Sequence, residues 1–324
     1  MPDRHSDRRH FLRLLAGAAA TVPLARRAAA QVAPKTPVEF TFTTGRDERD
    51  PTSVISAAAG GRNVVALYGR THPDAKASSV LLVNGGASAA NAAGFIRQPG
   101  LAIECLFNTD WHPENTGSNL IVAESGGQIL AHEFTKQYLS IDRPVEWQNT
   151  THKPLPAKAL PTKTFTKAGS MTFWGQTVQY GPLGQAHTDG DIYVFFPDRD
   201  ANMLVVGDVM TVGKYPIADY TSGGWLGGLV TATKTLLDLA KPDTRIVPGE
   251  GPIQTRADLQ AQYDMLSASR DAFVKMMRQG MSADDMLAAG ATKAFDAKWG
   301  DPKLFVKTSY RGLWLHVREV GGIV

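Results

Sequence analysis

Four separate apolar segments of this chain each run into a turn that carries side chains of the kinds that bind metal ions. The first turn is Asp110–Asn115, which follows the apolar stretch Leu101–Phe107. The others lie in Ala186–Asp191, Val206–Asp208 and Val247–Pro252. One polar strand end means little, but four in succession, with helical patterns between them, predict a layered α/β architecture.

The spacing of apolar residues predicts the elements of this architecture. Strands are expected at Val38–Thr43, Asn63–Tyr68, Ser79–Val83, Leu101–Phe107, Ile129–Ala131, Ser170–Gly175, Thr177–Tyr180, Ile192–Phe196, Met203–Val206 and Arg245–Val247. Helices are expected at Ala87–Arg97, after His132-Glu133, and at Gly227–Leu239, Leu259–Arg278, Ser282–Ala289 and Ala291–Lys298. The proline-rich stretch Ile141–Lys163 predicts a long extended loop.

The first thirty residues have the pattern of an export signal. Arg8-Arg9 precedes the apolar, alanine-rich stretch Leu14–Leu24, and Ala28–Ala30 offers a cleavage site made of small residues. We therefore expect a twin-arginine signal peptide, with the mature protein in the periplasm or secreted.

The rest of the chain is long enough for one large domain with an extension. We expect a signal peptide at 1–30, the main domain at 31–252, and a helical C-terminal extension at 253–324 packed on that domain. No apolar run in the mature chain is long enough to span a membrane.

Charge excludes one class of partner. Without the six arginines and two aspartates of residues 1–30, 28 basic and 29 acidic side chains remain, a net charge of −1. No basic face is left for binding nucleic acid. Cys105, the one cysteine, excludes an internal disulfide, and its place in an apolar strand predicts a packed thiol.

From Val38 to Pro252 the sequence resembles the metallo-β-lactamase-fold superfamily, through its Asp110–Asn115 motif and the three later strand ends. The resemblance implies a four-layer αββα sandwich with a metal site at the edge between two sheets. It also implies positions for the ligands. The first metal would be held by Asp110, His112 and His187, the second by Glu114, Asn115 and Glu250, and Asp208 would bridge the two.

Several of these positions depart from the family's residue types. His112, His187 and Asp208 keep them. Asp110, Asn115 and Glu250 stand where the family has histidine, Glu114 stands where it has aspartate, and Asn84 takes another acidic position.

The chemistry of the side chains at these positions indicates which metal ions could still bind. Asp110, His112 and His187 offer two imidazoles and a carboxylate, which can hold Zn²⁺ with one position open to water. The same set suits Fe(II). The second site would favour Mn²⁺ or Ca²⁺, or hold no ion. We expect one divalent metal, zinc or alternatively iron or manganese, and a second only doubtfully.

The resulting hypothesis is an exported hydrolase that acts on an ester, lactone, amide or related bond of a small molecule through a metal-bound water. Candidate metal ligands are Asp110, His112, His187, Asp208 and Glu250. Glu114 and Asp208 are the candidate catalytic residues, which would orient or deprotonate the water. Two alternatives remain. The protein could be a scaffold that has lost catalytic activity and binds a small molecule or a partner protein, or it could be a mononuclear Fe(II) enzyme.

Other polar residues near the motifs have simpler interpretations. His132 follows a strand outside the ligand positions and is expected to be structural. Asp189 and Asp191 are expected to bond the backbone of their own turn. Trp111 and Tyr215 belong either to the pocket wall or to the core.

Overall fold

The computed structural model describes residues 40–44, 52–57, 62–69, 79–87 and 100–322. The predicted signal peptide lies outside these residues. So does the helix expected at Ala87–Arg97, apart from Ala87 itself.

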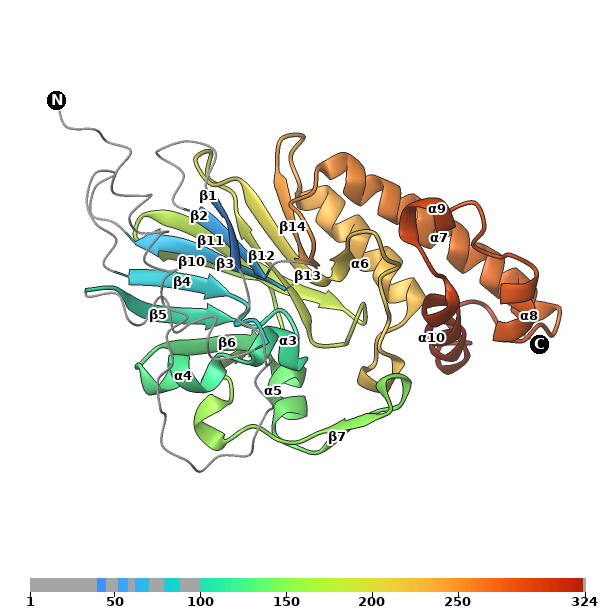
Figure 1. Cartoon of the computed structure of the whole chain (residues 1–324), viewed down its shortest axis with the longest axis horizontal. Helices are drawn as coiled ribbons and strands as arrows, with labels where there is room; N and C mark the ends of the chain where they lie inside the picture. The colour runs from blue at the N-terminus through green and yellow to red at the C-terminus, as the bar shows by residue number, and fades with distance from the viewer. Residues whose placement is uncertain (1–39, 45–51, 58–61, 70–78, 88–99, 323–324) are drawn as a thin grey trace.

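Two β-sheets form the centre of the molecule (Figure 1). The larger sheet has the strand order β1-β2-β3-β4-β5-β6-β9, with strands Phe40–Thr44, Thr52–Ala57, Asn63–Gly69, Ser79–Val83, Ala102–Phe107, Gln128–His132 and Lys163–Phe165. The smaller sheet runs in order from β10 to β14, with strands Gly169–Phe173, Gln176–Gly184, Asp191–Phe196, Met203–Thr211 and Arg245–Glu250. A separate hairpin pairs β7 (Arg143–Val145) with β8 (Thr150–His152).

The helices fall into two groups. Those that follow strands of the larger sheet are α3 (Pro113–Thr116), α4 (Asn119–Glu124) and α5 (Glu133–Leu139). Those that follow strands of the smaller sheet are α6 (Leu226–Leu239), between β13 and β14, and, after β14, α7 (Arg256–Arg278), α8 (Ala283–Ala288), α9 (Asp296–Trp299) and α10 (Lys303–Leu315). Short 3₁₀ helices lie at Glu146–Gln148 (η1), Ala157–Ala159 (η2) and Tyr220–Ser222 (η3).

Alternation along the strands explains the layers. In β3, Val65 and Leu67 point into a core between the two sheets, whereas Val64 and Ala66 pack on the outer side with residues of α4. Successive side chains of a strand point to opposite faces, so a strand covered on both sides is apolar throughout. The predicted αββα sandwich is confirmed.

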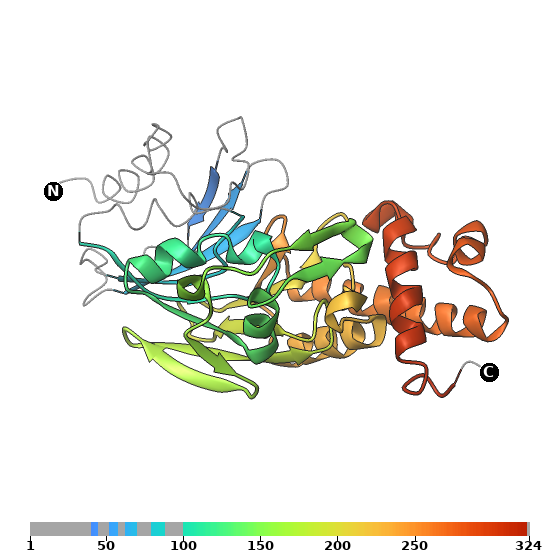
Figure 2. The ribbon, with the colours of Figure 1, turned by 90° about the horizontal axis from the view of Figure 1, so that it is seen from below.

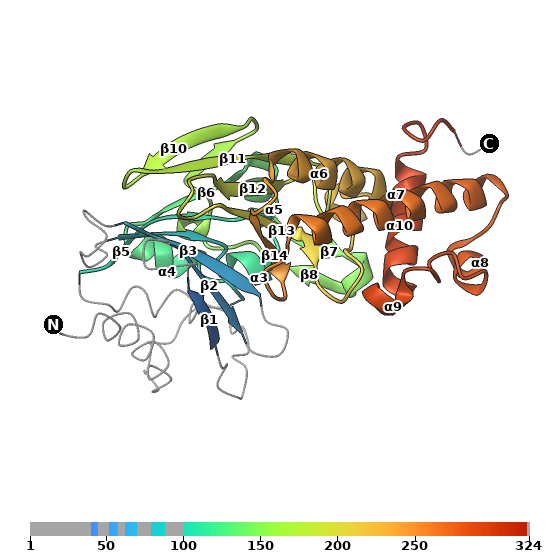
Figure 3. The ribbon, with the colours of Figure 1, turned by 90° about the horizontal axis from the view of Figure 1, so that it is seen from above.

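The C-terminal helices share a core with the outer face of the smaller sheet. Tyr193 and Phe195 of β12 belong to one apolar cluster with Leu229 of α6, Phe273 of α7 and Phe305 of α10. In Figures 2 and 3 the helices α8 to α10 lie at one end of the molecule and the β10–β11 hairpin lies toward the other.

The structure corrects several of the predicted elements and adds others, such as α10. Ile141–Lys163 is not one extended loop, since it contains the β7–β8 hairpin and two 3₁₀ turns. Its aliphatic and aromatic residues pack around Trp111, which explains why a polar, proline-rich stretch is ordered. Thr52–Ala57 forms an unpredicted strand, and residues 291–295 are turns instead of helix.

Among the described residues, no helix combines the length and the apolar character that crossing a membrane would require.

Candidate metal centre

The turn after β5 is fixed by buried amide side chains. Asn108 and Asn119 exchange two hydrogen bonds of 3.0 Å, one from each side-chain amide. The Thr109 backbone N–H donates to Oδ1 of Asn84 at 2.9 Å. Buried amides that satisfy one another in this way hold a loop in one conformation, so the next residues start from a rigid base.

Asp110 lies fully inside the protein and anchors the motif. Its Oδ1 accepts from the backbone N–H of His112 at 2.7 Å, and its Oδ2 accepts from Nδ2 of Asn115 at 2.7 Å. Each carboxylate oxygen has two lone-pair directions, so both can still face a cation.

His112 is held with one ring nitrogen toward the centre of the site and the other toward a carboxylate. Nδ1 lies 3.3 Å from Oδ1 of Asp110. Nε2 lies 3.5 Å from Oδ2 of Asp219, which is completely buried. The ring also stacks on Trp111, with centroids 4.3 Å apart. In the tautomer that carries its proton on Nε2, toward the Asp219 carboxylate, Nδ1 keeps a lone pair that faces inward as a potential ligand.

His187 reaches the same point from the loop between β11 and β12. Its Nδ1 lies 2.7 Å from the carbonyl oxygen of Ile217, so Nδ1 carries the proton and Nε2 is left with a lone pair. Asp191 accepts from the backbone N–H groups of His187 and Thr188, which fixes the loop. This is the turn role predicted for Asp191.

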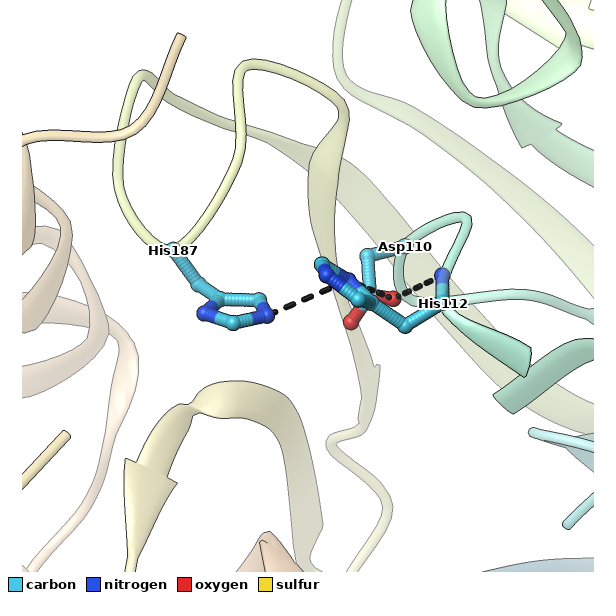
Figure 4. A group of neighbouring side chains, drawn as sticks. All are labelled: Asp110, His112 and His187. Atoms are coloured by element: carbon cyan, nitrogen blue, oxygen red, sulfur yellow. Dashed lines mark hydrogen bonds and ion pairs between the residues drawn. The ribbon is translucent and has the colours of Figure 1, made fainter. Parts of the chain in front are cut away.

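The three side chains converge although they come from two distant loops (Figure 4). Nε2 of His187 lies 3.2 Å from Nδ1 of His112. One ligand atom from each of Asp110, His112 and His187 lies within 4.8 Å of the others, and all three residues are buried. This spacing and donor set fit a divalent metal ion.

The charges around Asp110, His112 and His187 also favour a bound cation. Burial alone would lower the pKa of His112, but the Asp110 and Asp219 carboxylates raise it well above its ordinary value. Burial would likewise raise the pKa of Asp110, yet His112 and His187 hold it below the usual range. Two buried carboxylates therefore stabilise a cation at the histidines.

Two of the other predicted site residues, Asp208 and Glu250, lie beside this group and are bound to other partners. Asp208 Oδ2 accepts from Arg62 and, at 3.0 Å, from Nδ2 of Asn115, and it lies 4.0 Å from Nε2 of His187. Glu250 Oε1 accepts from Nζ of Lys214 at 2.7 Å. Asp208 also lies inside β13, which continues to Thr211, so it does not end a strand as predicted. The roles of Asp208 and Glu250 as ligands stay predictions.

A cavity of about 170 Å³ opens beside the two histidines. Its walls include His112, His187, Glu114, Asp208, Glu250, Arg62, Lys214, Trp147 and Tyr215. Glu114 is half-buried there, and no described residue donates a hydrogen bond to its carboxylate. Its catalytic role also stays a prediction, and its position on the wall is compatible with that role.

Sequence reasoning missed Arg62, Trp147 and Asp219. Arg62 directly precedes β3 in the sequence, and nothing in its spacing links it to the distant carboxylates. Trp147 donates from Nε1 to Oδ1 of Asp219 at 3.0 Å. The only local signal at Asp219 is that of a turn, since its side chain accepts from the Thr221 N–H and caps η3.

His132 and Cys105, which were expected to be structural, occupy structural positions, and Trp111, expected either in the pocket wall or in the core, is part of the core. His132 caps α5 by accepting from the Phe134 N–H, and it takes no part in the buried ligand group. Trp111 is buried beneath His112 and donates to Ser222. Burial raises the pKa of the Cys105 thiol to about 12, as suits a packed thiol.

Comparison with known proteins bears on the fold. The sequence matches no protein-family model and no curated protein. Among solved structures, a metallo-β-lactamase from Pontibacter korlensis is similar with a TM-score of 0.52 and 15% identity, over 71% of this chain and 99% of that one. The DIM-1 metallo-β-lactamase gives a TM-score of 0.55 at 14% identity, over 71% of this chain and 97% of that one. The chain therefore has the metallo-β-lactamase fold.

Proposed function

We propose that this protein is an exported hydrolase that depends on one divalent metal ion, zinc in the first instance. Its substrate would be a small molecule with an ester, lactone, amide or related bond. The export part of the proposal rests on the twin-arginine pattern of residues 1–30. The hydrolase part rests on the fold and on the buried group of Asp110, His112 and His187.

One observation carries the metal proposal. The outer nitrogens of both histidines point at fixed acceptors, the Ile217 carbonyl and the Asp219 carboxylate. Their inner nitrogens therefore face each other across 3.2 Å, beside the Asp110 carboxylate. Two lone pairs and a carboxylate repel one another unless a cation lies among them. A proton on His112 can supply that charge, and a divalent metal ion would supply it while using all three groups as ligands.

A bound divalent ion would supply Lewis acidity and lower the pKa of a coordinated water. The chain's own residues would do the rest. Glu114, on the cavity wall, would accept the proton of the attacking water. Asp219 and the Ile217 carbonyl would keep the two histidines oriented.

A second, larger hollow supports a small-molecule substrate. This cavity of about 550 Å³ lies between η1 and η3 on one side and helices α8 and α10 on the other. Trp147 lines both cavities, so a substrate with its reactive bond near His112 would extend past Trp147 into the larger one. The larger cavity is lined by aromatic residues and by the cations Lys307 and Arg311.

The same donor set supports a second candidate. Two histidines and one carboxylate also suit mononuclear Fe(II), which would make the protein an oxygen-dependent enzyme. Iron in the purified protein, together with turnover that requires oxygen, would favour this candidate over hydrolysis.

Elemental analysis of the folded protein tests the proposal. We expect about one equivalent of zinc, iron or manganese per chain, and its loss in His112→Ala and in His187→Ala. Metal added to metal-free protein should raise the melting temperature of the wild type and leave that of both variants unchanged.

His132→Asn is the matched control, because it alters a buried histidine outside the ligand group and keeps a side chain that can cap α5. It should retain the metal. The proposal would be contradicted if the wild type purifies without metal and its melting temperature does not respond to Zn²⁺, Mn²⁺ or Fe²⁺. That result would favour a scaffold without catalytic activity.

A further inference from the structure

We infer that the Arg62 guanidinium takes the place of a second metal ion and limits the centre to one. The inference rests on the proposed metal site, and it concerns residues that lie beside the three ligands. It explains why several carboxylates can share one small cavity.

Three carboxylates, Glu114, Asp208 and Glu250, line the cavity that also borders the two histidines. Carboxylates that share one small cavity repel one another unless a cation lies among them. Two metal ions could balance them, and so could one metal ion with a fixed basic side chain.

Arg62 is that basic side chain. One of its terminal nitrogens, Nη2, donates to Oδ2 of Asp208, and the other, Nη1, lies 4.0 Å from Oε2 of Glu250. Only 16% of the side chain is exposed. An arginine keeps its charge at every pH at which the protein is folded, so the positive charge at this position is permanent.

The backbone holds Arg62 at this position. Arg62 forms an isolated antiparallel bridge with Glu250, at the end of β14. The next residue, Asn63, donates from its side-chain amide to the carbonyl oxygens of Pro248 and Gly251, both at 2.8 Å. The start of β3 is thereby tied to the end of β14, so the two sheets together place the guanidinium.

Two of the other candidate ligands of a second ion, Asn115 and Glu250, are also held by partners. Asn115 donates from Nδ2 to both Asp110 and Asp208, so its amide nitrogen, not its oxygen, faces the carboxylates. Turning the amide over would bring its oxygen against two carboxylates. Glu250 is bound by Lys214 on its other oxygen. A second divalent ion would have to displace Arg62 and turn Asn115.

Removal of the guanidinium should therefore open a second metal position. In Arg62→Ala and in Arg62→Met, which keeps more of the apolar stem, we expect bound metal per chain to rise roughly twofold over the wild type after equilibration with Mn²⁺. The measurements are elemental analysis and the electron paramagnetic resonance spectrum of Mn²⁺, in which a pair of coupled ions differs from a single ion.

Lys214→Ala is the matched control. It removes a cation that also pairs with Glu250, but one whose side chain is 62% exposed, and it leaves Arg62 in place. The metal content should stay at the wild-type value. Arg62→Lys, which keeps a positive charge, should also stay there.

The outcomes separate this inference from the proposed function. If folded Arg62→Met binds no more metal than the wild type, the inference is overturned, whether the wild type holds one ion or none. If the wild type holds no metal and the variant gains an ion, the role of Arg62 stands and the proposed function fails.

Discussion

At the scale of single residues, one short segment orients both histidines of the candidate site. The Ile217 carbonyl accepts from Nδ1 of His187, and the Asp219 carboxylate faces Nε2 of His112. Each contact fixes which ring nitrogen is free to bind a metal. The ligands and the groups that aim them therefore come from different parts of the chain.

Asp219→Asn tests this arrangement. The asparagine can still accept hydrogen bonds in the η3 turn, but it lacks the charge that favours a proton on Nε2 of His112. Metal affinity should fall about 10- to 100-fold, as measured by competition with a chromophoric chelator. Asp189→Asn is the control, since Asp189 lies in a neighbouring turn and bonds Tyr138 instead of a ligand. If the two variants bind the metal with equal affinity, Asp219 does not orient His112 for metal binding.

At the scale of elements, the site depends on how helices α6 and α7 hold the outer face of the smaller sheet. Gln262 of α7 donates to the backbone carbonyl of Val209 in β13 at 2.9 Å, one residue from Asp208. Helix α7 begins at a capping box, in which the Thr255 hydroxyl accepts from the Asp258 N–H and the Asp258 carboxylate accepts from the Thr255 N–H. This cap satisfies backbone groups that the first turn of a helix otherwise leaves unpaired.

Thr255→Ala should destabilise the protein by about 1 kcal/mol, because it removes the side-chain half of the cap. A shift of the urea unfolding midpoint measures the effect. Thr235→Ala is the control, since Thr235 is exposed on α6 and its hydroxyl bonds only the carbonyl of its own helix. Alanine favours the helix interior there, so no loss is expected. An equal loss in both variants would mean that the cap contributes nothing.

At the scale of the whole molecule, the sequence predicted the layers better than the contacts between them. A strand with an unbroken apolar run, such as Val80–Val83 in β4, is expected to be buried on both faces. The predicted bounds of that strand, Ser79–Val83, match the structure. Asp110, His112 and His187 were predictable because they stand at the positions that the resemblance to the metallo-β-lactamase fold assigns to ligands of the first metal. Arg62 and Asp219 were not, because their partners are set by how the sheets and loops pack.

Cys105 reports on the integrity of the whole core. It lies 5% exposed in the core between the two sheets, and burial, with a smaller effect of Glu104, raises the pKa of its thiol to about 12. The folded protein keeps the thiol neutral, whereas the unfolded chain ionises it near the ordinary pKa of 9.0. The stability linked to the thiol is therefore complete below about pH 9 and is lost as the pH rises toward 12.

Comparison with Cys105→Ala isolates this effect, because all other titrating groups are common to both proteins. Between about pH 9 and 12 the wild type should lose up to about 1.4 kcal/mol per pH unit relative to the variant, as measured by urea unfolding. Below that range the difference between the two should be constant, since the small cavity left by alanine does not titrate. A thiol reagent should label native wild-type protein only as fast as the core opens. Immediate labelling at pH 8 would show that the two sheets do not close over Cys105.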